Sequence, residues 1–273
     1  MEALLERIAV DEETLIFSNA FPKGTLPLPM GVRDIAKDFE KIDNKEERRQ
    51  AYQEHKKLKS AKFIQRSWFD RIAKGDYRGF TEGLEAEGIQ THTMVHNMVS
   101  RDEGIVKNID NSGSLYEENE MFMENEDGYD VYVLSSLQCD VLENVVEMMF
   151  FLGIGKNKST GKGAFLIDGW HDETEILDNK GSNAFVALSN FVPGRRDPVK
   201  GMYKTMVKYG KLDREYANLD IPFKKPILFL QAGAVFFDDN VRKYYGSCIQ
   251  EVSVKEKVII NAQTIALPIQ MNL

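Results

Sequence analysis

The sequence predicts an α+β fold, because its C-terminal half places one helix pattern among several strand patterns. Residues 130–134 are rich in β-formers, and the apolar residues of 139–152 recur at helical spacing. Three further strands are expected at residues 164–168, 184–192 and 227–237. A strand, a helix and two strands in this order make half of a βαββαβ, ferredoxin-like unit.

The N-terminal half gives weaker signals for regular structure. Residues 1–8 have the apolar spacing of an amphipathic helix, and residues 15–17 are strand-like. Residues 34–59 are highly charged with sparse apolar positions, which predicts a solvated helix. Residues 91–99 and 114–123 are expected to pair as a hairpin across the turn signal Asp-Asn-Ser-Gly.

The composition is typical of a soluble globular protein, with 42% hydrophobic and 29% charged residues in 273. The formal net charge of −8 does not favour nucleic acid, but residues 33–78 hold 14 Lys and Arg against 9 Asp and Glu. A basic segment on an acidic body can still bind a polyanion. Two cysteines form neither a disulfide framework nor a zinc site, so we expect a cytoplasmic protein. Because no apolar run has the length of a membrane span, we expect no membrane partner.

A glycine-rich, basic segment at residues 153–163 is the clearest candidate binding site. It reads Gly-Ile-Gly-Lys-Asn-Lys-Ser-Thr-Gly-Lys-Gly. Glycine lets the backbone approach a ligand closely with positive φ, so that N–H groups converge on an anion while the lysines supply charge. The segment therefore predicts a phosphate cradle, with a flexible surface turn as the alternative.

The spacing of this segment does not match the common nucleotide motifs. A P-loop needs Gly, four residues, and then Gly-Lys followed by Ser or Thr, whereas Thr160 stands five residues after Gly155 and Gly163 follows Lys162. The dinucleotide fingerprint fails because Lys158 stands where its third glycine is required. What remains is a basic turn suited to a polyphosphate backbone, and we expect no cofactor.

Five segments together resemble a known family. Residues 153–165 are similar to the glycine-rich loop of the RAMP superfamily, the RRM-like proteins of CRISPR ribonucleoproteins. The other four, in the order of the family, are Ser-Asn-Ala-Phe-Pro at 18–22 with Leu-Pro-Leu-Pro at 26–29, Lys-Leu-Lys-Ser-Ala-Lys-Phe-Ile at 57–64, His-Asn-Met-Val-Ser-Arg at 96–101 with Leu-Tyr-Glu at 115–117, and Ala-Leu-Ser-Asn-Phe-Val-Pro at 187–193. The likeness spans nearly the whole chain. Together the five segments resemble the family of type III-A (Csm) subunits that hold the 5′ tag of the guide RNA.

The resemblance implies a fold and a function. Members of the family have two tandem RRM-like, ferredoxin-like domains and no catalytic activity of their own. Residues 1–128 would form an incomplete N-terminal RRM-like domain with a charged helical insertion and a hairpin. Residues 129–273 would form the C-terminal RRM-like domain with the glycine-rich loop. The implied partners, in antiviral defence, are the 5′ tag of the CRISPR RNA (crRNA), the large palm-domain polymerase-like subunit and the adjacent backbone RAMP subunit.

The resemblance also carries RNA-binding residues onto this chain. The positions that match the tag-binding loop are Gly155, Lys156, Asn157, Lys158, Ser159, Thr160, Gly161 and Lys162. Asn97 and Arg101 match the polar motif on the hairpin, which in the family lies near RNA. The resemblance implies no catalytic residue and no metal ligand.

The sequence departs from the family in two places. The family starts with a strand and a helix, of which only the helix end is found, at residues 1–8. We therefore expect either a shortened or split version completed by another chain, or a degenerate N-terminal domain. Further on, Lys-Tyr-Gly at 208–210 stands where an arginine is expected, and Ala-Gly-Ala at 232–234 stands where the family has Gly-Ser. The assignment of family residues to this chain is therefore weaker in that C-terminal part.

A rival interpretation is a metal-independent endoribonuclease that processes crRNA, because related RAMP nucleases cleave RNA with a histidine. The general base would be His171, which precedes Asp172, or His96. Lys158 or Lys162 would stabilise the pentavalent phosphorane.

A metal site is the weakest of the sequence hypotheses. His92 and His96 are four residues apart, as in a metalloprotease helix, but Thr93 stands where that motif requires Glu. Strand propensity instead places both histidines on one face of a sheet. We therefore expect no metal.

Overall fold

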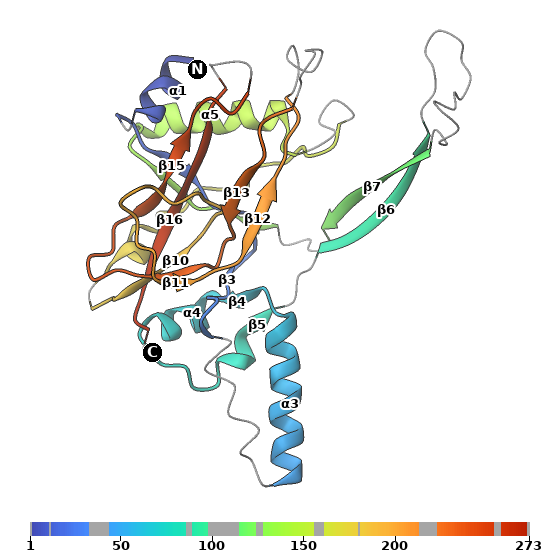
Figure 1. Cartoon of the computed structure of the whole chain (residues 1–273), viewed down its shortest axis with the longest axis vertical. Helices are drawn as coiled ribbons and strands as arrows, with labels where there is room; N and C mark the ends of the chain where they lie inside the picture. Colours follow the sequence, from blue (N-terminus) through green and yellow to red (C-terminus); the bar gives the residue numbers. More distant parts are fainter. Residues whose placement is uncertain are drawn as a thin grey trace.

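The computed structural model describes residues 2–10, 12–32, 44–85, 89–97, 115–123, 128–155, 161–179, 181–212, 223–253 and 258–271. The chain has a mixed α and β fold with many short strands and few helices (Figure 1). Every strand pair within these ranges is antiparallel. The predicted mixture of helices and strands is confirmed, and the tandem ferredoxin-like arrangement stays a prediction.

A five-stranded antiparallel sheet forms the centre of the C-terminal half. In sheet order its strands are β11 (Gly201–Met202), β14 (Val235–Phe237), β10 (Ala184–Ala187), β16 (Ile260–Ile269) and β15 (Tyr244–Ile249). Strand β16 pairs with β10 on one side and β15 on the other, and six successive residues, 262–267, are buried. Because successive side chains point to opposite faces, both faces of β16 are covered.

Two hydrophobic clusters cover the two faces of this sheet. Along β10, Ala184 and Val186 join the cluster that also holds Ile16, Phe21 and other N-terminal residues. The intervening residues of β10 join a second cluster, whose buried aromatic members are Phe185, Phe191, Phe236 and Tyr245. The N-terminal half therefore supplies the covering layer for one face of the sheet.

The N-terminal strands pair in part with strands from the other side of the predicted 128/129 boundary. Strand β1 (Leu15–Phe17) pairs with β9 (Val133–Ser135), and β2 (Phe21–Pro22) pairs with β8 (Tyr129–Asp130). A separate three-stranded sheet contains β3 (Thr25–Pro27), β4 (Phe63–Gln65) and β5 (Leu84–Glu85). The predicted division into residues 1–128 and 129–273 stays a prediction.

The helices lie at the edges of these sheets (Figure 1). They are α1 (Glu2–Ala9), α3 (Lys45–Ser60), α4 (Arg66–Ala73) and α5 (Cys139–Leu152), with the short 3₁₀ helices η2 (Phe80–Gly83) and η4 (Thr174–Leu177). Asn44 caps α3, since its side chain accepts from the Glu46 N–H at 3.0 Å. Most described residues of α3 are exposed, with Leu58 buried, so the predicted solvated helix is confirmed for this range. None of the described helices is both long and apolar enough to cross a bilayer.

Four of the predicted strands are wrong in detail. The expected strand at 130–134 is split between β8 and β9, and the expected strand at 184–192 ends at residue 187 as β10. Residues 164–168 form no strand, and Leu166 among them is exposed, so their apolar character is not used in a sheet. The expected strand at 227–237 is two strands in different sheets, β13 (Ile227–Leu230) and β14. Gly233 separates them with φ of +85°, and its N–H donates to the Ala187 carbonyl at 2.8 Å. The positive φ turns the chain from one sheet into the other.

Removing a buried side chain from β16 tests its central role. Leu267 is fully buried in the cluster shared with the N-terminal half. Leu267→Ala is expected to lower the free energy of unfolding by about 2–5 kcal/mol, because it leaves a cavity where both faces are covered. Urea unfolding measures this change. Val199→Ala, at an exposed position, is the matched control and should change the midpoint little. An equal effect of both variants would contradict the assignment of β16 as the buried centre.

Candidate nucleic-acid interface

The glycine-rich loop has a closed base immediately after α5. The Ile154 N–H donates to the Gly163 carbonyl at 2.9 Å, which brings the two ends of the loop together. Gly153, Gly155, Gly161 and Gly163 all have positive φ, and a Cβ at Gly163 would overlap the Ile154 carbonyl oxygen. Glycine is therefore required at the base by both conformation and space.

Only part of the glycine-rich loop lies within the described residues. The candidate residues that lie outside the described ranges are Lys156, Asn157, Lys158, Ser159 and Thr160. The flanking residues Gly155, Gly161 and Lys162 are described, and all three are exposed. The base of the loop is therefore at the surface, and the phosphate cradle stays a prediction.

The predicted hairpin is present and projects from the body of the molecule (Figure 1). Strands β6 (Ile89–Asn97) and β7 (Leu115–Met123) pair continuously, from Ile89 opposite Met123 to Asn97 opposite Leu115. Asn97 is thus the last residue of β6, and Arg101 lies outside the described residues. The register puts His96 and His92 on one face, as predicted from strand propensity, with Glu118 and Glu120 of β7.

An ion pair joins the loop to the hairpin. The Lys162 ammonium group contacts Oε1 of Glu120, whose side chain is largely buried. His96 Nε2 lies 3.8 Å from Glu118 Oε2 and 3.8 Å from Glu120 Oε1. The two segments that the resemblance assigned to RNA therefore meet in one site.

The same cluster contains a set of donors that sequence reasoning missed. One donor atom each from His96, Glu118 and Glu120 lies within 4.8 Å of the others, a set that can hold a divalent cation. The expectation of no metal considered only His92 with His96, whereas the carboxylates come from the opposite strand. Only the register of the hairpin could have revealed them. Because the Lys162 ammonium group already lies against Glu120, a bound cation would have to share or displace that contact.

The expected acid and base pair at residues 171–172 is arranged differently. Oδ1 of Asp172 accepts hydrogen bonds from the Thr174 N–H at 2.9 Å and the Thr174 hydroxyl at 2.6 Å. These bonds lower the pKa of Asp172 from its ordinary value. Asp172 therefore fixes the start of η4, and His171 is exposed beside it.

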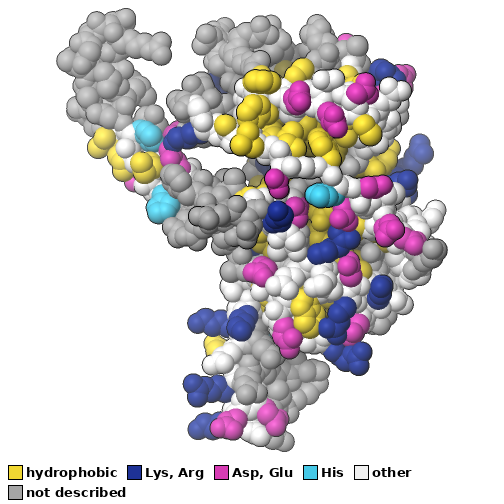
Figure 2. Space-filling view, turned by 180° about the vertical axis from the view of Figure 1, so that it is seen from behind, with side chains coloured by type: hydrophobic (Ala, Val, Ile, Leu, Met, Phe, Trp, Pro, Cys, Tyr) yellow, Lys and Arg dark blue, Asp and Glu magenta, His cyan; other side chains and the backbone are white. Residues whose placement is uncertain are grey.

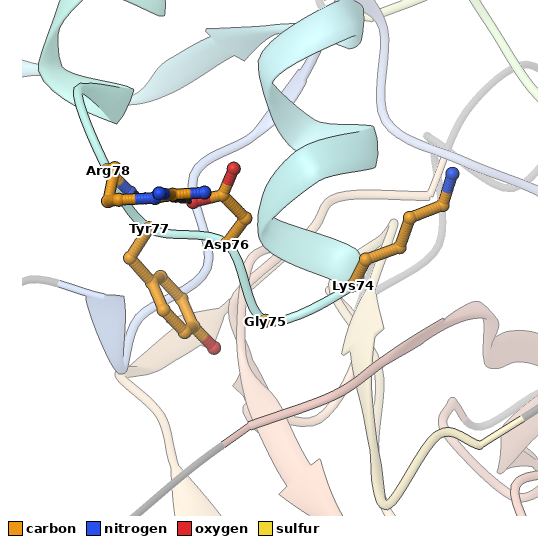
Figure 3. A pocket seen from close by; sticks show the side chains of 5 residues that line it. All are labelled: Lys74, Gly75, Asp76, Tyr77 and Arg78. Atoms are coloured by element: carbon orange, nitrogen blue, oxygen red, sulfur yellow. Dashed lines mark hydrogen bonds and ion pairs between the residues drawn. The ribbon is translucent and has the colours of Figure 1, made fainter.

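A shallow depression at the end of α4 is lined by Lys74, Gly75, Asp76, Tyr77 and Arg78 (Figure 3). Asp76 accepts hydrogen bonds from Arg78 Nε at 2.9 Å and from Arg71 Nη2 at 2.9 Å. These bonds hold the pKa of Asp76 well below its usual range. Because Asp76 engages both arginines, their positive charge is partly offset within this depression.

Helix α5 carries an exposed apolar surface, seen at the top of Figure 2. The exposed apolar side chains of the helix and the segments that follow it are Val141, Met148, Phe151, Leu152, Ile154, Leu166, Ile167 and Trp170. Phe150 on α5 packs edge-to-face on Phe165, with ring centroids 5.9 Å apart. A contiguous apolar surface of this kind is typical of a protein interface.

The fold resembles two solved structures. A subunit in the crystal structure of the Csm1-Csm4 cassette in complex with pppApApA matches 99% of this chain and 83% of that chain, with a TM-score of 0.51 and 17% identity. A subunit in the crystal structure of the Csm3-Csm4 subcomplex of the type III-A CRISPR-Cas interference complex matches 99% of this chain and 88% of that chain, with a TM-score of 0.52 and 15% identity. The chain therefore shares its fold with a subunit of these Csm complexes.

The resemblance stated from the sequence is confirmed at the level of the Csm fold. Csm4 is the component that both neighbouring complexes have in common. No family model matches the chain, and no curated protein matches it. The Csm likeness therefore rests on structure and on the short motifs above.

A double-mutant cycle tests whether the loop and the hairpin are coupled. Lys162→Met and Glu120→Gln each remove one partner of the ion pair, and we expect a coupling free energy of about 0.5–1 kcal/mol from urea unfolding. The matched control replaces Glu117, which lies on the opposite face of β7, with Gln. Its cycle with Lys162→Met should give no coupling, and equal coupling in both cycles would contradict the contact.

Proposed function

We propose that the chain is a non-catalytic RNA-binding subunit of a type III CRISPR ribonucleoprotein, which grips the 5′ tag of the crRNA in the cytoplasm and serves antiviral defence. The observation that carries this proposal is the contact of the glycine-rich loop with the β6–β7 hairpin through Lys162 and Glu120. Both segments match RNA-binding motifs of the family. The Csm-like fold supports the same role in the effector complex.

The chemistry of the loop suits a nucleic-acid backbone. Backbone N–H groups presented by glycine residues, together with lysine ammonium groups, bind phosphate without reading sequence. Base-edge contacts would then come from Asn157, Ser159 and Thr160 in the loop and from Asn97 and Arg101 on the hairpin. Recognition of single-stranded RNA needs such contacts in addition to charge.

The ion pair between Lys162 and Glu120 affects how strongly RNA would bind the loop. A phosphate that binds Lys162 must compete with the Glu120 carboxylate, which already contacts the ammonium group. Lys162 then exchanges one electrostatic contact for another, so it contributes little to the free energy of RNA binding. Under this proposal, affinity comes mainly from the remaining loop residues, and Glu120 restrains binding of unspecific anions.

Docking to other subunits is the second part of the proposal. The neighbouring structures are a Csm1-Csm4 cassette and a Csm3-Csm4 subcomplex. By analogy we propose that this chain docks the large palm-domain polymerase-like subunit and the adjacent backbone RAMP subunit. The exposed apolar surface on α5 supports such docking, because apolar surface left in water favours a protein partner.

Salt dependence tests the loop as the tag-binding site. Lys156→Ala, Lys158→Ala and Lys162→Ala together should lower the affinity for a tag-bearing crRNA and reduce the slope of log K against log salt by about 1.4, since Lys156 and Lys158 each contribute about 0.7 and Lys162 exchanges one contact for another. Fluorescence anisotropy across a salt series measures both quantities. An unchanged slope would remove the loop from the RNA interface. Cleavage of a repeat-containing transcript that is lost in His171→Ala would instead establish the endoribonuclease.

Neutralising the hairpin carboxylate should strengthen RNA binding. Glu120→Gln removes the group that competes for Lys162, so the affinity for the same RNA should rise about two- to fivefold. Glu117→Gln makes the same change of charge on the opposite face of β7 and is the matched control. If both variants gain equally, general electrostatics explains the effect and the proposed competition at Lys162 is wrong.

A further inference from the structure

The segment that contains the two-stranded sheet of β12 (Thr205–Lys208) and β13 is a second basic part of the chain, after residues 33–78. Residues 198–212 and 223–237 contain six lysines and no Asp or Glu. The connecting residues 213–222, which lie outside the described part, add one arginine and three acidic residues. The whole segment is therefore basic in a protein whose formal net charge is −8.

One face of this sheet, here called the ribbon face, exposes apolar and aromatic side chains. Val207 lies opposite Leu228, and Tyr209 follows Val207 on the same face. The Tyr209 ring stacks on Phe223, with centroids 5.2 Å apart and planes 9° apart. The exposed fractions are 62% for Val207, 59% for Tyr209, 57% for Leu228 and 41% for Phe223.

The opposite face of β12 and β13 is partly packed, since Met206 there is half-buried and Lys208 is exposed. Phe229 is buried, and Lys208 Nζ lies 4.9 Å from the centroid of the Phe229 ring. Burial lowers the pKa of Lys208 from its ordinary value. The exposed apolar and aromatic surface therefore lies on the part of the ribbon face around Val207, Tyr209, Leu228 and Phe223, whereas Leu230 at the other end of β13 is buried.

Hydrogen bonds fix the end of the ribbon that carries the aromatic pair. The Lys224 N–H donates to the Gly210 carbonyl at 2.8 Å, and the Lys225 N–H donates to the Val252 carbonyl at 2.7 Å. An isolated bridge joins Lys211 to Phe223. The rings and the neighbouring lysines thus sit on a pinned backbone, which lowers the entropy lost on binding.

A cross-strand aromatic pair also stabilises a hairpin, and an exposed apolar face can bind protein. The positive charge near the aromatic pair favours nucleic-acid binding over these two other roles. Lys211, Lys224 and Lys225 lie within two residues of Tyr209 or Phe223 along the chain, and Lys211 and Lys225 are exposed while Lys224 is half-buried. Aromatic rings exposed beside a row of cations are the combination that binds single strands, because every base has a π-face and every nucleotide a phosphate.

We propose that the ribbon face is a binding surface for single-stranded nucleic acid, on which a base stacks against the Tyr209–Phe223 pair while Lys211, Lys224 and Lys225 contact phosphates. This surface is built from other elements than the glycine-rich loop. It reads no sequence, because its described groups are ring faces and ammonium groups. RNA and DNA offer the same chemistry to it.

Binding of homopolymers tests the proposal on the full chain. The probes are fluorescent oligouridine and oligothymidine of about 15 nucleotides, neither of which contains the crRNA tag. Tyr209→Leu with Phe223→Leu should lower the affinity for oligouridine about fivefold or more, because the apolar volume remains while stacking is lost. Tyr209→Phe keeps the ring and should retain the affinity.

The lysines have their own matched pair of variants. Changing Lys211, Lys224 and Lys225 to Gln should reduce the slope of log K against log salt, whereas changing all three to Arg should preserve it. Photocrosslinking of a 4-thiouridine oligonucleotide, read by peptide mass spectrometry, should label the peptides that contain Tyr209 or Phe223. This positional readout uses the wild-type chain and does not depend on how well a variant folds.

Each result supports or overturns the proposal. Loss of affinity for both probes supports a surface open to either nucleic acid, and loss for oligouridine alone supports an RNA surface. Unchanged affinity for both probes in the Leu variant, without crosslinks at the ribbon, overturns it. If that variant instead loses the large palm-domain subunit, the ribbon face is a protein interface.

The proposal for the ribbon face and the proposed function of the loop can be disproved independently of each other. The loop variant of Lys156, Lys158 and Lys162 should lose tag-bearing RNA and keep oligouridine, whereas the ribbon variants should show the largest loss on oligouridine. A loop variant that binds tag-bearing RNA normally would disprove the proposed function and leave the ribbon proposal intact. Loss of oligouridine binding only in the loop variant would overturn the ribbon proposal.

Discussion

The structure depends on a strand that is buried on both faces. Strand β16 lies inside the five-stranded sheet, with the N-terminal layer against one face and the Phe185–Tyr245 cluster against the other. In that second cluster the rings of Phe185 and Tyr245 stack with centroids 4.0 Å apart. Because both layers pack on one strand, neither half can be removed without exposing apolar surface to water. The halves are therefore interdependent in stability, even where they differ in function.

The candidate nucleic-acid interface differs from this core in burial and in the kind of contact that holds it together. Its groups are exposed or partly exposed, and they come from a loop base and a projecting hairpin. Lys162 and Glu120 join these two segments by charge, a contact that salt and competing anions weaken. A rigid core thus carries a contact that a ligand can replace at low energy. Such a division is typical of proteins that place binding residues on loops over a fixed scaffold.

The local signals in the sequence were sufficient where neighbouring residues decide the structure. Helix α5 spans the predicted 139–152, and β1 and both strands of the hairpin lie close to their predicted positions. Strands β15 and β16 were missed, because their strand state depends on pairing that only the folded sheet supplies. The hairpin register also escaped prediction. The expected turn at 110–113 would pair other residues than the observed Asn97 and Leu115, so the clustering of His96 with Glu118 and Glu120 was hidden.

The base of the glycine-rich loop has a consequence for substitutions in the rest of the loop. A side chain at Gly163 would collide with the Ile154 carbonyl, and the hydrogen bond between these residues closes the loop independently of its tip. The fold therefore specifies where the segment leaves and rejoins the body and leaves the composition between those points free. Substitutions at residues 156–160 would therefore leave unchanged the two points at which the loop joins the body.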